Sequence, residues 1–140
     1  MTAIHPQLAK DCLLLGKFTL CHLLLMRDDN YPWCILVPDR KDITEIHQLS
    51  EADQQQLLRE SSQLSLAMES AFSPDKLNIA ALGNVVPQLH LHHIARYRTD
   101  AAWPAPVWGR VAVKPYLDYE LEAVVNSLTS LLTTGFTAAG

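Results

Sequence analysis

The sequence has few cysteines, no excess of positive charge and no long hydrophobic run, and each absence excludes a class of protein. The net charge of -4 over 140 residues argues against binding nucleic-acid backbone, which needs a basic surface. The three cysteines are odd in number and lack the close pairing of a zinc site or a disulfide framework. Apolar stretches such as residues 23–26 are too short to cross a membrane, and no secretory signal is expected. We therefore expect one cytoplasmic domain with reduced thiols.

The most informative stretch is residues 87–94, which reads Pro-Gln-Leu-His-Leu-His-His-Ile. Successive side chains of a β-strand point to opposite faces, so Gln88, His90 and His92 are predicted to share one face. The two leucines between them face the other way and can anchor the strand in a core. Near neutral pH an imidazole can be a nucleophile, a proton shuttle or a metal ligand, and two imidazoles beside an amide suit an anionic substrate. The pattern indicates a functional site.

The segments around this stretch predict an antiparallel sheet. Aliphatic runs are typical of strands, and the turn signal at residues 28–32 predicts a hairpin. A short helix is expected within residues 6–15. Strands in a run, with helices segregated from them, predict an α+β fold with about five strands. The expected strands are residues 18–20, 21–27, 33–37, 77–82 and 89–96.

Two main helices are expected beside the sheet. Ser50 is a good N-cap, and Pro74 ends the helix that follows it. Asp118 is predicted to cap a second helix whose apolar face ends near Gly135. In the first helix the recurrence of apolar residues at helical spacing predicts a core face and leaves a polar face for solvent. The core face comprises Leu57, Leu64, Met68 and Ala71, and the solvent face comprises Gln55, Arg59, Glu60 and Gln63.

The alternation at residues 88–92, Gln-Leu-His-Leu-His, resembles the histidine-triad (HIT) motif, in which histidines alternate with hydrophobic residues along one strand. Residues 82–87 resemble the lead-in to that motif, where a glycine and an amide precede it. Residues 30–38 resemble the family's strand that ends in proline before the long helix. Residues 100–109 resemble a bacterial branch with glutamine at the first triad position.

The resemblance covers about residues 4–116, and a C-terminal helix at about 118–134 completes one domain of residues 1–140. It implies a HIT-like α+β fold, with a roughly five-stranded antiparallel sheet and two main helices. HIT proteins are commonly homodimers. Residues 103–108, with two tryptophans stiffened by prolines, are where we expect part of that interface and a wall of the nucleotide pocket.

The resemblance implies a nucleotide-binding hydrolase or transferase acting at a nucleotide α-phosphate, on a dinucleoside polyphosphate or a nucleoside phosphoramidate. His90 matches the nucleophile that forms a covalent nucleotidyl-histidine intermediate, and His92 matches the histidine that hydrogen-bonds the phosphate oxygens. Asn84 matches an amide near the phosphates, and Asn30 or Asp28 lies where the family contacts the ribose. An AMP-like moiety is favoured as ligand. No metal or other cofactor is required, and Mg2+ is compatible with polyphosphate substrates.

Gln88 departs from the motif, because it replaces the first histidine and removes a titratable group while keeping a donor and an acceptor. Substrates with good leaving groups are therefore favoured. The alternative is a catalytically weak nucleotide-binding sensor or interaction protein. A metal protein is a third reading, since imidazoles two residues apart can chelate, but zinc would need further ligands that the neighbouring sequence does not offer.

Several other polar side chains receive structural interpretations. His93 is predicted to point away from the histidine pair and to be packed. Arg96 is predicted to lie on the face of the pair in a surface ion pair. His22 and His47 are expected at the surface. Asn84 serves either the turn after the preceding glycine or a phosphate contact.

Overall fold

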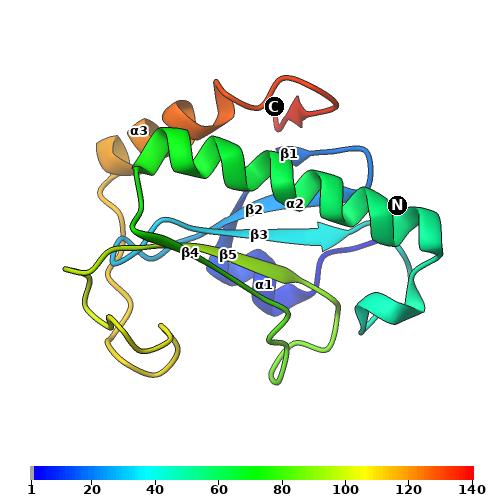
Figure 1. Ribbon diagram of the computed structural model, residues 1–140, viewed down its shortest axis with the longest axis horizontal. Coiled ribbons are helices and arrows are strands. Elements are labelled where there is room, and N and C mark those ends of the chain that lie inside the picture. The colour runs from blue at the N-terminus through cyan, green and yellow to red at the C-terminus, as the bar shows by residue number, and fades with distance from the viewer. Residues whose placement is uncertain (1) are drawn as a thin grey trace.

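An antiparallel six-stranded sheet in the order β4-β5-β3-β2-β1-β6 forms the centre of the computed structural model, which describes residues 2–140 (Figure 1). The predicted α+β fold is confirmed, although β1 and the two-residue β6 were not predicted and the strand expected at residues 18–20 is absent. The strands are β1 Cys12–Lys17, β2 Cys21–Met26, β3 Trp33–Pro38, β4 Lys76–Ala80, β5 Leu91–Arg96 and β6 Thr137–Ala138. The helices are α1 Pro6–Asp11, the 3₁₀ turn η1 Ile46–Gln48, α2 Glu51–Phe72 and α3 Asp118–Thr129. No helix among these residues is long and apolar enough to span a membrane.

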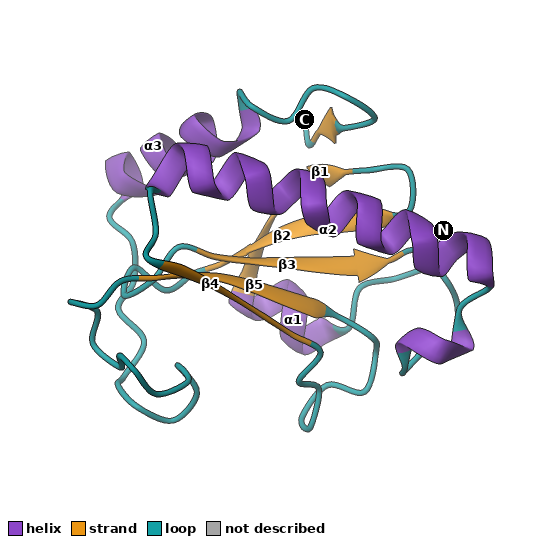
Figure 2. Ribbon diagram, in the orientation of Figure 1, coloured by secondary structure: helices purple, strands orange, loops and turns teal. Residues whose placement is uncertain are grey.

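Helices cover both faces of the sheet, with α2 and α3 on one face and α1 on the other (Figure 2). Alternate residues of the central strands therefore belong to two apolar clusters. In β2, Leu23 and Leu25 pack under α2, whereas Leu24 packs with Leu8 of α1 and with Trp33. Burial on both faces explains why this strand reads as a continuous apolar run.

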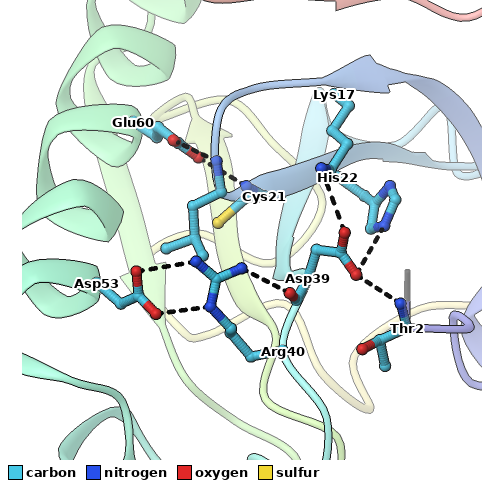
Figure 3. A network of polar contacts seen from close by, with 9 residues as sticks. Thr2, Lys17, Cys21, His22, Asp39, Arg40, Asp53 and Glu60 are labelled. Atoms are coloured by element: carbon cyan, nitrogen blue, oxygen red, sulfur yellow. Dashed lines mark hydrogen bonds and ion pairs between the residues drawn. The ribbon is translucent and has the colours of Figure 1, made fainter.

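The connection between β1 and β2 differs from the prediction. The first helix ends at Asp11 and β1 begins at the next residue, while residues 18–20 form a turn and not a strand. Glu60, predicted to face solvent, is 1% exposed, and its carboxylate accepts hydrogen bonds from the backbone N–H groups of Leu20 and Cys21, each at 2.8 Å (Figure 3). The turn leaves these two donors without a strand partner, and a buried acceptor from α2 satisfies them.

The two long helices begin close to the predicted positions, and α2 also ends close to its predicted end, whereas α3 ends several residues before the predicted end near Gly135. The hydroxyl of Ser50 accepts a hydrogen bond from the Asp53 N–H at 3.1 Å, which confirms the N-cap of α2. The helix ends one residue before Ser73, whose φ of 46° is left-handed. The cap of α3 is Leu117, so the prediction that Asp118 caps it is wrong by one residue, and α3 ends at Thr129.

Two surface predictions are wrong, because polar and aromatic partners enclose the side chains. Arg96 is 1% exposed: its Nε donates to the carboxylate of Asp100 at 2.8 Å, and its guanidinium lies over the ring of Trp103. His22 is 7% exposed and lies 4.0 Å from a carboxylate oxygen of Asp39 (Figure 3). Burial lowers the pKa of His22. His47 is exposed, as predicted.

Candidate functional site

Two histidines meet where β5 begins. His90 lies immediately before the strand and His92 lies within it, so the alternation of a strand turns both rings to one face. Their ring centroids are 4.8 Å apart and the rings are inclined at 70°. His92 is flanked by Ile35 of β3 and Ala80 of β4, its partners across the ladders. The strand therefore holds the pair from both sides.

The backbone fixes the protonation pattern of His90. Its Nδ1 lies 2.7 Å from the carbonyl oxygen of Gln88, which can only accept, so Nδ1 carries the proton and donates. In the neutral ring the lone pair is then on Nε2. Gly83 lets the loop fold closely on itself beside the ring, because a Cβ there would lie 2.8 Å from the Val86 carbonyl oxygen. This arrangement suits a nucleophile.

His92 is held in the opposite tautomer. The indole Nε1–H of Trp33, a group that only donates, bonds to Nδ1 of His92 at 3.0 Å. Nε2 therefore carries the proton and donates to the carbonyl oxygen of Leu82 at 3.0 Å. Burial lowers the pKa of His92 to about 4, so the ring is neutral near pH 7. Both ring nitrogens have protein partners, and the predicted phosphate contact remains a prediction.

Trp108 completes the surroundings of His92. Its ring centroid lies 5.0 Å from that of His92, nearly perpendicular to it, and 5.7 Å from that of Trp33. The segment that follows β5 thus returns to the site, as expected of a wall of the pocket. Trp103, by contrast, packs over Arg96, away from the histidines.

His90 lines two cavities. One, of about 270 Å³, lies beside α1, and the other, of about 320 Å³, lies beside the loop before α2. Gly83, Asn84 and His90 line both, so the loop after β4 separates them. The first is otherwise lined by Gln7, Leu8, Asp11, Met26, Leu82, Val85, Val86, His92 and Trp108. The second is otherwise lined by Thr44, Glu45, Ala81, Pro87, Gln88 and Leu89.

The remaining predicted site residues lie at different distances from the pair. Asn84 is exposed on the loop that lines both cavities. Asp28 is buried, and its Oδ1 accepts from the side-chain amide of Asn30 at 2.8 Å and from the backbone N–H of Lys114 at 3.3 Å. Asn30 also donates to the Ala112 carbonyl at 2.9 Å. Asp28 and Asn30 thus tie a loop to residues 112–114, and a ribose contact by either remains a prediction.

Gln88 shares no hydrogen bond with the histidine rings in the described residues, apart from the one that its backbone carbonyl accepts. Its side-chain Oε1 accepts from the His5 N–H at 2.8 Å, and its Nε2 donates to the Ala3 carbonyl at 3.0 Å. Sequence reasoning missed these partners, which lie more than 80 positions away. It also missed Asp11 of α1, which lines the first cavity.

His93 faces the opposite side of β5, as predicted. Its ring is fully buried, with Nδ1 donating to the Leu91 carbonyl at 3.0 Å and Nε2 lying 2.7 Å from the hydroxyl of Ser61 on α2. Burial lowers the pKa of His93 to about 4. None of the cavities described here is lined by His93 or Ser61, so this pair is structural.

Metal and thiol chemistry find little support in the described residues. Residues 2–140 contain no group of three or more His, Cys, Asp or Glu side chains arranged to hold a metal ion. Burial raises the pKa of the Cys12 and Cys34 thiols to about 12, and it also raises the pKa of Cys21. Buried thiols of this kind are poor nucleophiles.

In the described residues, His90 keeps an unbonded Nε2 immediately before β5 and lies beside a second, neutral histidine. The chain belongs to the HIT domain family, whose sequence model matches residues 7–99. That assignment confirms the resemblance of the triad segment. Members of this superfamily include nucleotide-binding hydrolases and transferases, and some members are not catalytic.

Solved structures of histidine triad proteins agree with this assignment. The chain is 51% identical to one from Marinobacter aquaeolei VT8, with a TM-score of 0.91, covering 94% of this chain and 96% of that one. It is 44% identical to one from Bradyrhizobium japonicum, with a TM-score of 0.92 and coverage of 94% and 98%. A third, from Sinorhizobium meliloti 1021, is 38% identical, with a TM-score of 0.89 and coverage of 91% and 95%. No curated protein matches the chain.

Proposed function

We propose that this protein is a nucleotide hydrolase or nucleotidyl transferase that acts at a nucleotide α-phosphate through a covalent intermediate on His90. The observation that carries the proposal is the hydrogen bond from Nδ1 of His90 to the Gln88 carbonyl, which leaves the Nε2 lone pair available. A neutral imidazole is a competent nucleophile near pH 7.

The chemistry has two steps. Nε2 of His90 attacks the α-phosphorus, and the bond from phosphorus to the leaving group breaks with its electron pair on the leaving group. The resulting imidazolium is stabilised by the Gln88 carbonyl, which accepts from Nδ1–H. Water, or another acceptor, then attacks the phosphorus and loses its proton to solvent, while the bond from phosphorus to Nε2 breaks and its electron pair returns to Nε2.

The two cavities beside His90 suit the two sides of this reaction. Leu8, Met26 and Trp108 give the first cavity apolar and aromatic walls, which suit a nucleoside such as that of AMP. The second is lined by polar side chains, among them Thr44, Asn84 and Gln88, together with a few apolar ones, and this more polar lining suits the leaving group. A polyphosphate leaves as an anion without first taking up a proton, so dinucleoside polyphosphates are favoured over alkyl phosphoramidates.

Three further contacts follow from the lining of the site. Asn84 is proposed to donate to the phosphate from the loop that lines both cavities. His92 is proposed to exchange the Leu82 carbonyl for a phosphoryl oxygen as charge develops, because catalytic hydrogen bonds often form fully only with substrate bound. For the ribose hydroxyls, Asp11 is proposed ahead of Asn30, because it lines the first cavity.

A catalytically weak nucleotide sensor is the second candidate. It is favoured by the engagement of both atoms of the Gln88 amide with Ala3 and His5, since this leaves the first triad position without a group to assist the leaving group. Such a protein would bind AMP as well as the enzyme would, and would turn over substrates very slowly.

A calorimetric titration with AMP and a turnover assay on dinucleoside polyphosphates and nucleoside phosphoramidates distinguish the candidates. The proposed enzyme binds AMP, turns over at least one substrate class, and forms an acid-labile nucleotidyl adduct on His90 that mass spectrometry detects after quenching. AMP binding without turnover or adduct would favour the sensor, and no binding at all would refute both.

The cofactor and assembly proposals are tested in the same preparation. Turnover of a phosphoramidate should persist in excess chelator, because His90 supplies the nucleophile, whereas Mg2+ should matter only for polyphosphate substrates. We also propose a homodimer, which sedimentation at micromolar concentration would detect. A monomer under those conditions would refute that part.

A further inference from the structure

The side-chain amide of Gln88 forms hydrogen bonds with the backbone of residues 3 and 5, as a backbone peptide group would. Its Oε1 accepts from the N–H of His5 at 2.8 Å, and its Nε2 donates to the carbonyl of Ala3 at 3.0 Å. The two partners are two residues apart, the spacing at which an extended strand offers a donor and an acceptor on the same edge. The hydrogen bond to His5 is part-buried, whereas the one to Ala3 is exposed to solvent.

The held segment leads directly into α1. The carbonyl of His5 accepts from the Ala9 N–H at 3.0 Å, and its ring Nδ1 accepts from the Gln7 N–H at 3.1 Å. The helix then presents Gln7, Leu8 and Asp11 to the first cavity. Fixing His5 therefore fixes the start of the helix that forms one wall of that cavity.

Other attachments also hold this segment, since Ile4 packs against the apolar cluster that includes Leu8 and Trp33. The far end of α1 is tied by the backbone, where the Arg27 N–H donates to the Asp11 carbonyl at 3.0 Å. Thr2 donates to Asp39 at 2.6 Å, one residue before the segment that Gln88 holds. Among residues 2–140, the recorded side-chain hydrogen bonds that reach residues 3–5 from elsewhere in the chain come from Gln88.

We propose that Gln88 is a positioning residue, which holds residues 3–5 and thereby sets the α1 wall of the nucleoside cavity, and that it takes no part in leaving-group departure. The proposal rests on the proposed function only for the identity of what occupies that cavity. An amide presents its acceptor and donor side by side, whereas the two nitrogens of an imidazole diverge around the ring. A histidine at position 88 therefore cannot hold both partners.

Hydrogen–deuterium exchange tests the link without any substrate. In Gln88→Met, which keeps the length of the side chain but removes the amide, uptake in residues 2–11 should rise at least several-fold, because local opening becomes easier. Uptake in β5 should stay unchanged. Unchanged uptake in residues 2–11 would overturn the proposal.

Two substitutions at His5 test the hydrogen bond between the His5 N–H and Gln88 from the side of its donor. The φ of His5 is -51°, which proline adopts, so His5→Pro removes the N–H that bonds Gln88 without straining the backbone. His5→Ala is the matched control, because it removes only the ring cap and keeps that N–H. Faster exchange in His5→Pro than in His5→Ala is the expected result, and the double variant His5→Pro, Gln88→Met should exchange no faster than Gln88→Met alone, because that substitution already removes both hydrogen bonds. Additive effects would show that Gln88 acts through other contacts.

Substrate binding separates positioning from chemistry. Gln88→Met and His5→Pro should each raise the AMP dissociation constant and KM by roughly tenfold, the effect of losing one or two neutral hydrogen bonds, with kcat changed less than threefold. A fall in kcat that grows as the leaving group becomes poorer would overturn the proposal, since Gln88 would then act on departure. If the unmodified protein fails to bind AMP, the proposed function is refuted, and the exchange comparison still decides whether Gln88 holds the segment.

Discussion

His92 and His93 are neighbours in the chain, and much about them is the same. Both are buried, burial lowers both pKa values to about 4, and each ring donates to one backbone carbonyl. The remaining nitrogen of each ring meets a side chain, the indole of Trp33 for His92 and the hydroxyl of Ser61 for His93. They differ in which face of β5 they occupy.

That difference shows that burial and a shifted pKa do not by themselves identify a reactive histidine. His93 faces α2 inside the apolar core, where its hydrogen bonds join a helix to the sheet. His92 faces the ring of His90 and a cavity that can admit a ligand. An imidazole therefore has a structural role on one face of the strand and belongs to a candidate active site on the other face.

The largest expected effect comes from removing the proposed nucleophile. His90→Ala should abolish measurable turnover, because no other group on that face offers a free imidazole nitrogen, while AMP affinity should change only a few-fold. Turnover assays and calorimetry on the same preparation give both numbers, with the circular dichroism spectrum as the folding control. Near-normal turnover in this variant would show that the two faces of β5 do not differ in the way proposed.

His92→Ala should lower kcat by roughly 10²–10³, the typical cost of one lost transition-state hydrogen bond. It should also destabilise the protein by about 1–3 kcal/mol, because it leaves the buried Trp33 N–H without its acceptor. Steady-state kinetics and urea unfolding measure the two effects. A loss of stability without a loss of kcat would place His92 in the same structural role as His93.

In contrast to His92→Ala, His93→Ala should lower stability and leave kcat nearly unchanged. Truncation leaves the Ser61 hydroxyl unpaired beside a new cavity, so the free energy of unfolding should fall by about 2–4 kcal/mol. The kcat of the folded fraction should stay within a factor of two or three, because the ring lies across the sheet from His90. Urea titrations and turnover below the unfolding transition test this, and a hundredfold loss of kcat would contradict it.

The most gradual effect is a dependence of stability on pH that His92 and His93 share. His92 and His93 each have a folded-state pKa of about 4, against about 6.5 in the unfolded chain. Between these two pH values the unfolded chain therefore binds more protons than the folded protein. Stability should therefore be full above about pH 6.5 and fall as pH drops toward 4, by up to ~1.4 kcal/mol per pH unit for each histidine. His22 adds to this slope in the same direction. Urea midpoints from pH 4 to 7 measure the slope, which His93→Ala should reduce.

Local patterns in the sequence predict the sheet and the shared face of His90 and His92 correctly. Alternation along β5 and the Ser50 cap depend on near neighbours, which the sequence displays directly. Glu60 was misplaced because its partners lie in the turn before β2. Arg96 was misplaced although Asp100 is only four residues away, because Asn78 of β4 and the ring of Tyr31 also enclose its guanidinium. The periodicity of apolar residues predicts which face of a helix or strand a side chain occupies. It does not show whether a polar partner in the core allows that side chain to be buried.

The candidate site was likewise predicted only in part. The family resemblance supplies the roles expected of Asn84 and His90, but the Trp33 indole on His92 depends on the pairing of β3 with β5. The engagement of Gln88 with Ala3 depends on how the start of the chain crosses the sheet. No local pattern encodes such contacts, since they arise from packing.

The fluorescence of the tryptophan indoles around His92 can report on the state of the site. Of the three tryptophans in the chain, Trp33 bonds to that ring and Trp108 packs against it, whereas Trp103 lies over Arg96. Indole emission is sensitive to a neighbouring imidazole, to its protonation and to a base that stacks nearby. Intrinsic fluorescence should therefore follow ligand arrival at this site without any label, and a stopped-flow trace would time the formation of the complex separately from the chemistry that follows.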